Sequence, residues 1–191
     1  MSKKKDDRRV QYTKMVIKES LINLLSEKPL SKITVKELCF NAGINRATFY
    51  SHYRDIYDLM NKIQDELLAN VESYLDLVNF DHPDSTLPFQ AMEQVFEYIK
   101  DNAKLTTHLL GKDGDFDFQR RVFTLAYNKI SGDFGKTINN IDDTEYLHTF
   151  IITGAVGAIR KWLNDEMVQS PKYMAKLVIN LAFGIPTLAF K

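Results

Sequence analysis

Apolar residues recur every three or four positions along almost the whole chain, whereas alternation with a period of two is nearly absent. Helices repeat every 3.6 residues and strands every two, so this spacing favours helices. The three clearest stripes are Ile17, Leu21, Leu24 and Leu25; Leu59, Ile63, Leu67, Val71 and Leu75; and Met174, Leu177, Val178, Leu181, Ala182 and Ile185. The sequence therefore predicts an all-α protein.

The composition limits the class of protein. With 191 residues, 45% of them hydrophobic, the chain can bury the core of one large domain or of two smaller ones. No apolar run reaches the roughly 20 residues that cross a bilayer, and the charged N-terminus lacks the apolar segment of an export signal. Cys39 is the single cysteine, so the chain has no disulfide framework. We therefore expect a cytoplasmic protein that does not span a membrane.

Charge is unevenly distributed along the chain. Residues 1–62 contain 13 lysine and arginine residues and 7 acidic residues, a net charge of +6, whereas residues 63–191 carry a net charge of −6. A basic N-terminal part indicates contact with a polyanion, although a solvated charged surface gives the same pattern.

Residues 34–53 contain the signals of two short helices joined by a tight turn. Thr34 and Glu37 form a capping-box pattern, Gly43 suits the left-handed conformation that ends a helix, and Asn45 can cap the next one. The single cysteine lies where the two helices must approach, which predicts a small buried group rather than a nucleophile. This arrangement is typical of a helix-turn-helix, whose second helix can enter a DNA major groove.

Helical geometry assigns the faces of that second helix. Phe49 and Tyr53 lie about one turn apart and are expected to face the core, so Ala47 and Ser51 point outward. Small outward residues let a helix approach the bases, and cationic or hydroxyl-bearing flanks can contact guanine or phosphate. The alternative is a solvated helix hairpin that serves protein contact. The candidate DNA-binding residues are Thr34, Asn45, Arg46, Ala47, Thr48, Tyr50 and His52.

Three segments of this region resemble the DNA-binding domain of TetR-type bacterial transcription regulators. They are residues 34–38 (TVKEL), 41–50 (NAGINRATFY) and 53–59 (YRDIYDL), and the resemblance covers about residues 10–60. A weaker similarity, to a subgroup that includes regulators of dihydroxyacetone kinase operons, covers residues 150–163 and the Ser-Pro pair that follows at 170 and 171.

The resemblance implies two domains. Residues 1–54 would form a DNA-binding domain, with a first helix at about 10–27 and the helix-turn-helix at 34–53. Residues 55–191 would form a helical ligand-binding and dimerisation domain that begins with a connecting fourth helix.

One position departs from the family pattern. Where similar regulators usually carry a lysine that contacts phosphate at the start of the fourth helix, this chain has Ile56. Ile56→Lys is expected to restore that contact and steepen the salt dependence of DNA binding, unless Ile56 packs inward, in which case lysine would lower the melting temperature.

The C-terminal part carries a second predicted contact. Between residues 150 and 159 only Thr153 is polar, and a helix that is apolar nearly all round must be covered on several faces. Its small residues would let another helix come close, so we expect a homodimer formed with the final helix; an ordinary core helix is the alternative. The candidate interface residues are Gly154, Gly157, Ala158, Leu177 and Leu181.

A set of aromatic and methionine residues could line a pocket for a small-molecule effector, although such residues at helical spacing more often form plain core. The set is Phe89, Met92, Phe96, Phe123, Tyr127 and Trp162.

Enzyme and metal functions find little support in the sequence. Asp113, Asp115 and Asp117 imitate half of a calcium loop, but Phe118 and Thr124 replace its glycine and glutamate. The histidines lack metal-binding spacing, and no phosphate-binding glycine loop is present, so we expect no metal, no cofactor and no catalysis.

These observations predict a homodimeric transcription regulator that binds double-stranded, palindromic operator DNA, and repression released by an unidentified effector is expected. Activation, or control by a protein partner, is one alternative. A helical protein-interaction module without DNA binding is another, and a small helical enzyme is the most remote.

Overall fold

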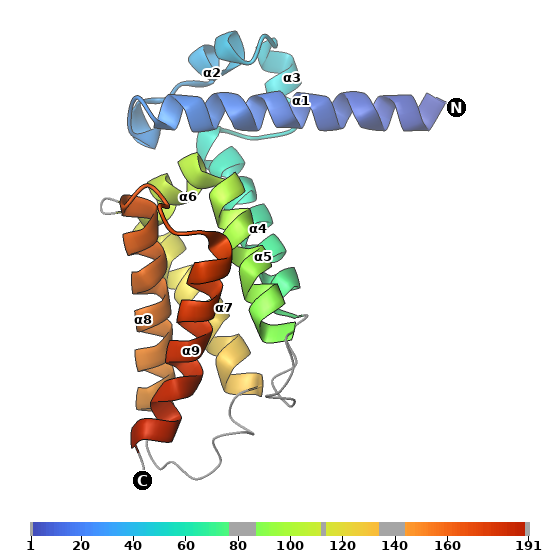
Figure 1. The fold of residues 1–191 in the computed structure, drawn as a ribbon. Coiled ribbons are helices and arrows are strands. Elements are labelled where there is room, and N and C mark those ends of the chain that lie inside the picture. The colour runs from blue at the N-terminus through green and yellow to red at the C-terminus, as the bar shows by residue number, and fades with distance from the viewer. Residues whose placement is uncertain (1, 77–86, 112–113, 134–143, 190–191) are drawn as a thin grey trace. The chain divides into compact units, whose positions relative to one another are not determined.

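The computed structural model describes residues 2–76, 87–111, 114–133 and 144–189, and within these ranges it contains α-helices and no strand. The all-α prediction is confirmed. None of the helices in the described ranges is long and apolar enough to cross a membrane. In chain order the elements are α1 (Ser2–Leu25), a 3-10 turn (Leu30–Lys32), α2 (Val35–Asn41), α3 (Arg46–Tyr50), α4 (Ile56–Leu75), α5 (Leu87–Asp101), α6 (Ala103–Leu110), α7 (Phe116–Asp133), α8 (Thr144–Asn164) and α9 (Pro171–Ala189) (Figure 1).

The chain forms two compact units, Met1–Leu67 and Leu68–Lys191, and their boundary falls inside α4. The core of the first unit is built from α1 to α4, each of which contributes fully buried side chains: Ile17, Leu21, Leu38, Phe49 and Leu59. Helix α1 begins at Ser2 rather than near residue 10. The charged residues before Val10 have adequate helix propensity and include no proline or glycine, so the helix continues through them.

The local signals of the helix-turn-helix act as predicted. The Thr34 hydroxyl accepts a hydrogen bond from the Glu37 amide (3.3 Å), and the Asn45 side chain accepts one from the Thr48 amide (2.8 Å). After α2, Gly43 adopts a left-handed φ of 63°, and the Ile44 amide donates back to the Cys39 carbonyl (3.0 Å). This is the Schellman ending that glycine favours.

The second unit packs its helices around one apolar core. Helix α5 packs along α9, α8 contacts α6, α7 and α9, and α6 contacts α7. Phe96, Leu105, Leu109, Phe118 and Ile152 are buried there. Lys129 of α7 forms ion pairs with Glu72 (3.3 Å) and with Asp76 near the end of α4.

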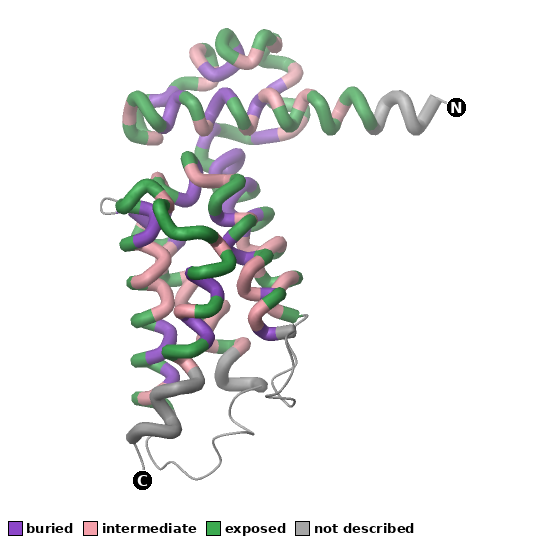
Figure 2. Tube along the Cα trace, in the orientation of Figure 1, coloured by how far each residue is buried: buried purple, intermediate pink, exposed green. Residues whose placement is uncertain are grey.

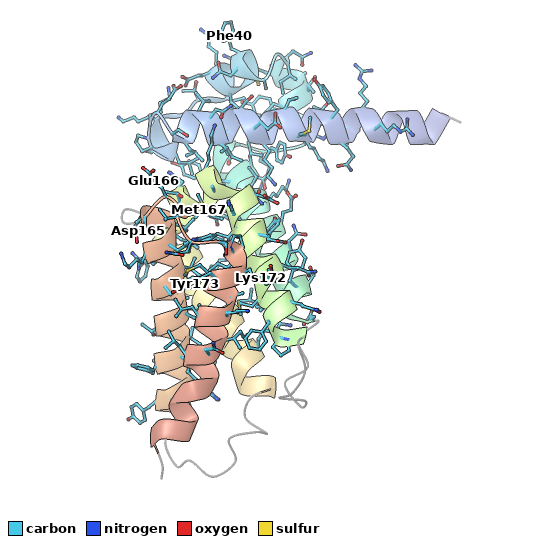
Figure 3. All side chains as sticks on the ribbon, viewed as in Figure 1. Phe40, Asp165, Glu166, Met167, Lys172 and Tyr173 are labelled. Atoms are coloured by element: carbon cyan, nitrogen blue, oxygen red, sulfur yellow. The ribbon has the colours of Figure 1, made fainter. Side chains whose placement is uncertain are left out.

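The connection from α8 to α9 contains unusual backbone (Figure 3). Glu166 and Met167 both have φ of 55°, a left-handed conformation that L-residues other than glycine adopt at a cost. The Met167 amide donates to the Trp162 carbonyl (2.9 Å), and the Trp162 indole donates to the Gln169 carbonyl (2.8 Å). These bonds hold the connection in its strained form.

Glu166→Gly is expected to stabilise the protein. Glycine removes roughly 1–2 kcal/mol of left-handed strain from the folded state. About half of this stabilisation is offset because glycine increases the conformational entropy of the unfolded chain. The midpoint of thermal unfolding, followed by circular dichroism, should rise by about 2–4 °C. Glu97→Gly, at an exposed position inside α5, is the matched control and should lower it. A lower midpoint for Glu166→Gly would contradict the strain argument.

Candidate nucleic-acid interface

Helix α3 has a buried face and an exposed face, as its sequence predicted. Phe49 is completely buried and Tyr53 is 8% exposed, and their ring centroids lie 5.6 Å apart. Ala47 and Ser51 are exposed on the other side. The core therefore fixes the rotation of the helix about its axis, and small residues lie outermost.

The polar candidates surround this outward face. Arg46 and Tyr50 are exposed, and the Tyr50 ring contacts Phe49 edge-on at 5.5 Å. The Thr48 hydroxyl bonds to the Asn45 side chain (3.1 Å), and His52 is half-buried. The fold thus gathers onto α3 and its ends a guanidinium, a phenol, an imidazole and hydroxyl groups, which are donors suited to phosphate oxygens and base edges.

The remaining candidate, Thr34, is exposed at the start of α2. Two neighbouring residues of α2 differ sharply in exposure. Cys39 is 3% exposed and burial raises the pKa of its thiol, which agrees with the prediction of a buried, unreactive group. Phe40 is 85% exposed, a feature that sequence reasoning missed (Figure 3).

A polar network, also missed from the sequence, joins the end of α3 to α4. The Asp58 carboxylate accepts hydrogen bonds from the Arg54 amide (2.9 Å) and from the Lys62 ammonium (3.1 Å). The Arg54 amide, followed by Lys62, lowers the pKa of Asp58. Lys62 also donates to the His52 carbonyl (3.1 Å) and lies 5.0 Å from the centre of the Tyr53 ring. The four-residue spacing of Asp58 and Lys62 is the signal that could have revealed it.

Ile56 does not occupy a surface position. Its side chain is 5% exposed and forms part of the core at the start of α4. This inward packing is the alternative under which lysine lowers the melting temperature instead of restoring a phosphate contact.

In the second unit, the pocket candidates are only partly brought together. Phe96 and Trp162 are buried against each other, with ring centroids 5.2 Å apart at 80°. Phe89, Met92, Phe123 and Tyr127 are partly exposed.

Of the calcium-loop candidates, Asp113 lies outside the described residues, Asp115 caps α7 by accepting from the Phe118 amide (2.8 Å), and Asp117 pairs with Arg120 (3.0 Å).

His148 is a buried polar residue that sequence reasoning overlooked. It is 4% exposed, its ring lies 6.3 Å from that of Tyr127, and burial lowers its pKa. Within the described part of the chain its Nε2 atom has no hydrogen-bond partner. Helical spacing places it four residues before the buried Ile152, so the period of α8 could have identified it.

Buried, half-buried and exposed residues follow one another along α8, as expected for a helix with one side against the core (Figure 2). Phe150 is 63% exposed, and Gly154 and Gly157 have nothing within 4 Å of the place where a Cβ atom would be. On α9, Leu181 is 54% exposed. The candidates Ala158 and Leu177 are half-buried. We call the exposed set Tyr146, Phe150, Gly154, Gly157 and Leu181 the α8–α9 face.

Known proteins resemble the chain along most of its length. The HTH-type transcriptional regulator YxbF of Bacillus subtilis (strain 168) is 28% identical over 169 residues, 86% of this chain and 43% of that protein. The chain thus spans less than half the length of this curated relative.

Two solved structures share the fold. A TetR transcriptional regulator from Streptococcus agalactiae 2603V is 22% identical, with a TM-score of 0.61 over 93% of this chain and 97% of that chain. The dihydroxyacetone kinase operon activator DhaS is 16% identical, with a TM-score of 0.59 over 92% and 97%.

All three proteins are described as regulators, and none as an enzyme. The family model of the TetR-type transcriptional regulator C-terminal region matches residues 87–184, just over half of the chain. The chain therefore belongs to the TetR family of transcription regulators.

Proposed function

We propose that the first unit binds operator DNA by placing α3 in the major groove. The observation that supports this most directly is the division of α3 into a buried Phe49/Tyr53 side and an exposed side of small, cationic and hydroxyl-bearing residues. Arg46 is assigned to a guanine edge, and Thr34, Asn45, Thr48, Tyr50 and His52 to the sugar-phosphate backbone. Ala47 lies closest to the bases.

The second unit is proposed to hold two copies together through the α8–α9 face. A patch containing two exposed aromatic side chains and two open glycines has the composition of a helix contact site. A twofold dimer presents its two recognition helices symmetrically, so the operator should be palindromic. The candidate pocket residues of this unit, Phe96 and Trp162 among them, are proposed to serve an effector.

Repression is the proposed mode of regulation, in the cytoplasm where a bacterial promoter lies. A bound dimer blocks the promoter by occupancy alone, whereas activation also requires a productive contact with the transcription machinery. The alternative is activation or control by a protein partner, favoured by the structural likeness to a protein described as an operon activator.

Arg46→Ala tests the docking of α3. Operator sequences are first selected from a random DNA pool with the wild-type protein. Loss of a bidentate arginine contact should then weaken operator binding by about 1–3 kcal/mol, roughly 5- to 150-fold in Kd, and relax preference at one base pair of each half-site. Arg120→Ala, an exposed arginine of α7, is the matched control and should leave Kd unchanged.

Other outcomes have distinct meanings. A loss that is equal for all DNA sequences would make Arg46 a phosphate contact, and no loss would reject the docking of α3. Weak binding to any DNA that does not depend on salt would favour a protein-interaction module instead.

A further inference from the structure

The first unit contains a cleft that the proposed function does not use. Its volume is about 480 Å³, within the range of small-molecule sites. It is lined by residues of α1 and α4 and by two residues that follow α3. The lining residues are Gln11, Lys14, Met15, Lys18, His52, Tyr53, Lys62, Ile63 and Glu66.

The lining combines cationic and apolar side chains. Three lysines and one carboxylate, that of Glu66, line the cleft. Lys18 pairs with Glu66 at 3.2 Å, and Lys62 pairs at 3.1 Å with Asp58, which is not part of the lining. Lys14 has no ion pair within the described ranges. Met15, Tyr53 and Ile63 supply the apolar surface. A net positive site that also offers apolar surface suits an anion that carries an apolar body.

One of the three lysines connects the cleft to the recognition helix. Lys62 donates to the His52 carbonyl just beyond α3, and its ammonium lies over the Tyr53 ring. An anion that attracts Lys62 competes with these two contacts and with the Asp58 ion pair. The end of α3 would then lose a tether at the point where His52 is proposed to contact DNA.

We propose that this cleft binds an organic monoanion with an aromatic or alkyl body, such as an aromatic carboxylate, and that the bound anion weakens operator binding by drawing Lys62 away from His52. The binding site stands independently of the proposed function, whereas its effect on DNA rests on it. The site lies in the helix-turn-helix unit, apart from the effector pocket proposed for the second unit.

Binding is tested without DNA by using methionine methyl groups as reporters. The chain has six methionines, of which Met15 lines the cleft and Met174 is buried in the second unit. The full chain, labelled with ¹³C at the methionine methyls, is titrated with 2-naphthoate. The Met15 signal should shift and saturate, and that of Met174 should not move. A motionless Met15 signal would overturn the proposal.

Charge selectivity and the role of the lysines are tested by matched controls. The neutral 2-naphthylmethanol and inorganic phosphate should each bind at least tenfold more weakly than 2-naphthoate, because each lacks one of the two required features. Lys14→Gln should weaken 2-naphthoate binding severalfold, whereas Lys172→Gln, an exposed lysine of α9, should not. Equal binding of all three probes, or equal affinity in both variants, would reject an anion site.

The effect on DNA is measured separately, at constant ionic strength. Saturating 2-naphthoate should raise the operator Kd of the wild type at least threefold, and by a smaller factor in Lys14→Gln. A saturable Met15 shift with no change in Kd would retain the site and reject its coupling to DNA. Failure of the wild type to bind any selected operator would instead reject the proposed function.

Discussion

Gly157→Arg is expected to convert the proposed dimer into a monomer while leaving the fold of each chain intact. A Cβ atom at Gly157 meets nothing within 4 Å in the single chain, so the arginine side chain has room there. Replacing a glycine inside α8 should even favour the helix by about 0.8–1 kcal/mol. Any loss of assembly must therefore come from the contact between two copies.

The size of the effect follows from what a second helix would meet. A guanidinium caught in the α8–α9 face without a partner costs about 3–5 kcal/mol, which raises the dimer Kd by more than about 100-fold. Sedimentation equilibrium at micromolar concentration should show a dimer for the wild type and a monomer for the variant. Gln94→Arg, on the exposed side of α5, should remain dimeric.

Two results would count against this interface. A monomeric wild type at these concentrations would show that the α8–α9 face does not hold two copies together. A Gly157→Arg dimer of unchanged affinity would place the contact on another surface of the second unit.

Ile56→Lys is expected to destabilise the first unit. The side chain of Ile56 is 5% exposed, so lysine replaces packed methyl groups with an ammonium that lacks solvent. A cost of about 2–4 kcal/mol should lower the midpoint of thermal unfolding by roughly 5–15 °C.

The neighbouring residue provides the control for charge at this helix end. Tyr57 is 55% exposed, so Tyr57→Lys adds the same charge and should change stability by less than about 0.5 kcal/mol. An unchanged midpoint for Ile56→Lys, together with a steeper dependence of log Kd on log salt, would show that this position reaches the phosphate backbone after all.

Features that depend on neighbouring residues were predictable from the sequence. The caps at Thr34 and Asn45, the left-handed Gly43 and the two faces of α3 all follow from spacing within one or two turns. Even here one detail differs. The Glu37 carboxylate, expected to complete the capping box, accepts a hydrogen bond from Lys28.

Features that join distant segments were not predictable. The cleft brings Lys14 of α1 next to Lys62 of α4, and no pattern within either helix shows that they meet. The inward packing of Ile56 was uncertain for the same reason, since the first apolar residue of a helix can face either way until its neighbours are known. His148 differs, because the period of α8 contains the information.

Helix α3, the proposed recognition helix, has only five residues, Arg46–Tyr50, well below the length at which a helix is stable alone. Its shape is therefore held by Phe49, Tyr53 and the Lys62 network, while Arg46, Ala47 and Tyr50 contribute little to folding. Exposed positions of this kind can be exchanged with changes in stability of about 0.5 kcal/mol or less. A duplicated gene could thus acquire a new target site by exchanging these side chains alone, without first accumulating stabilising mutations elsewhere.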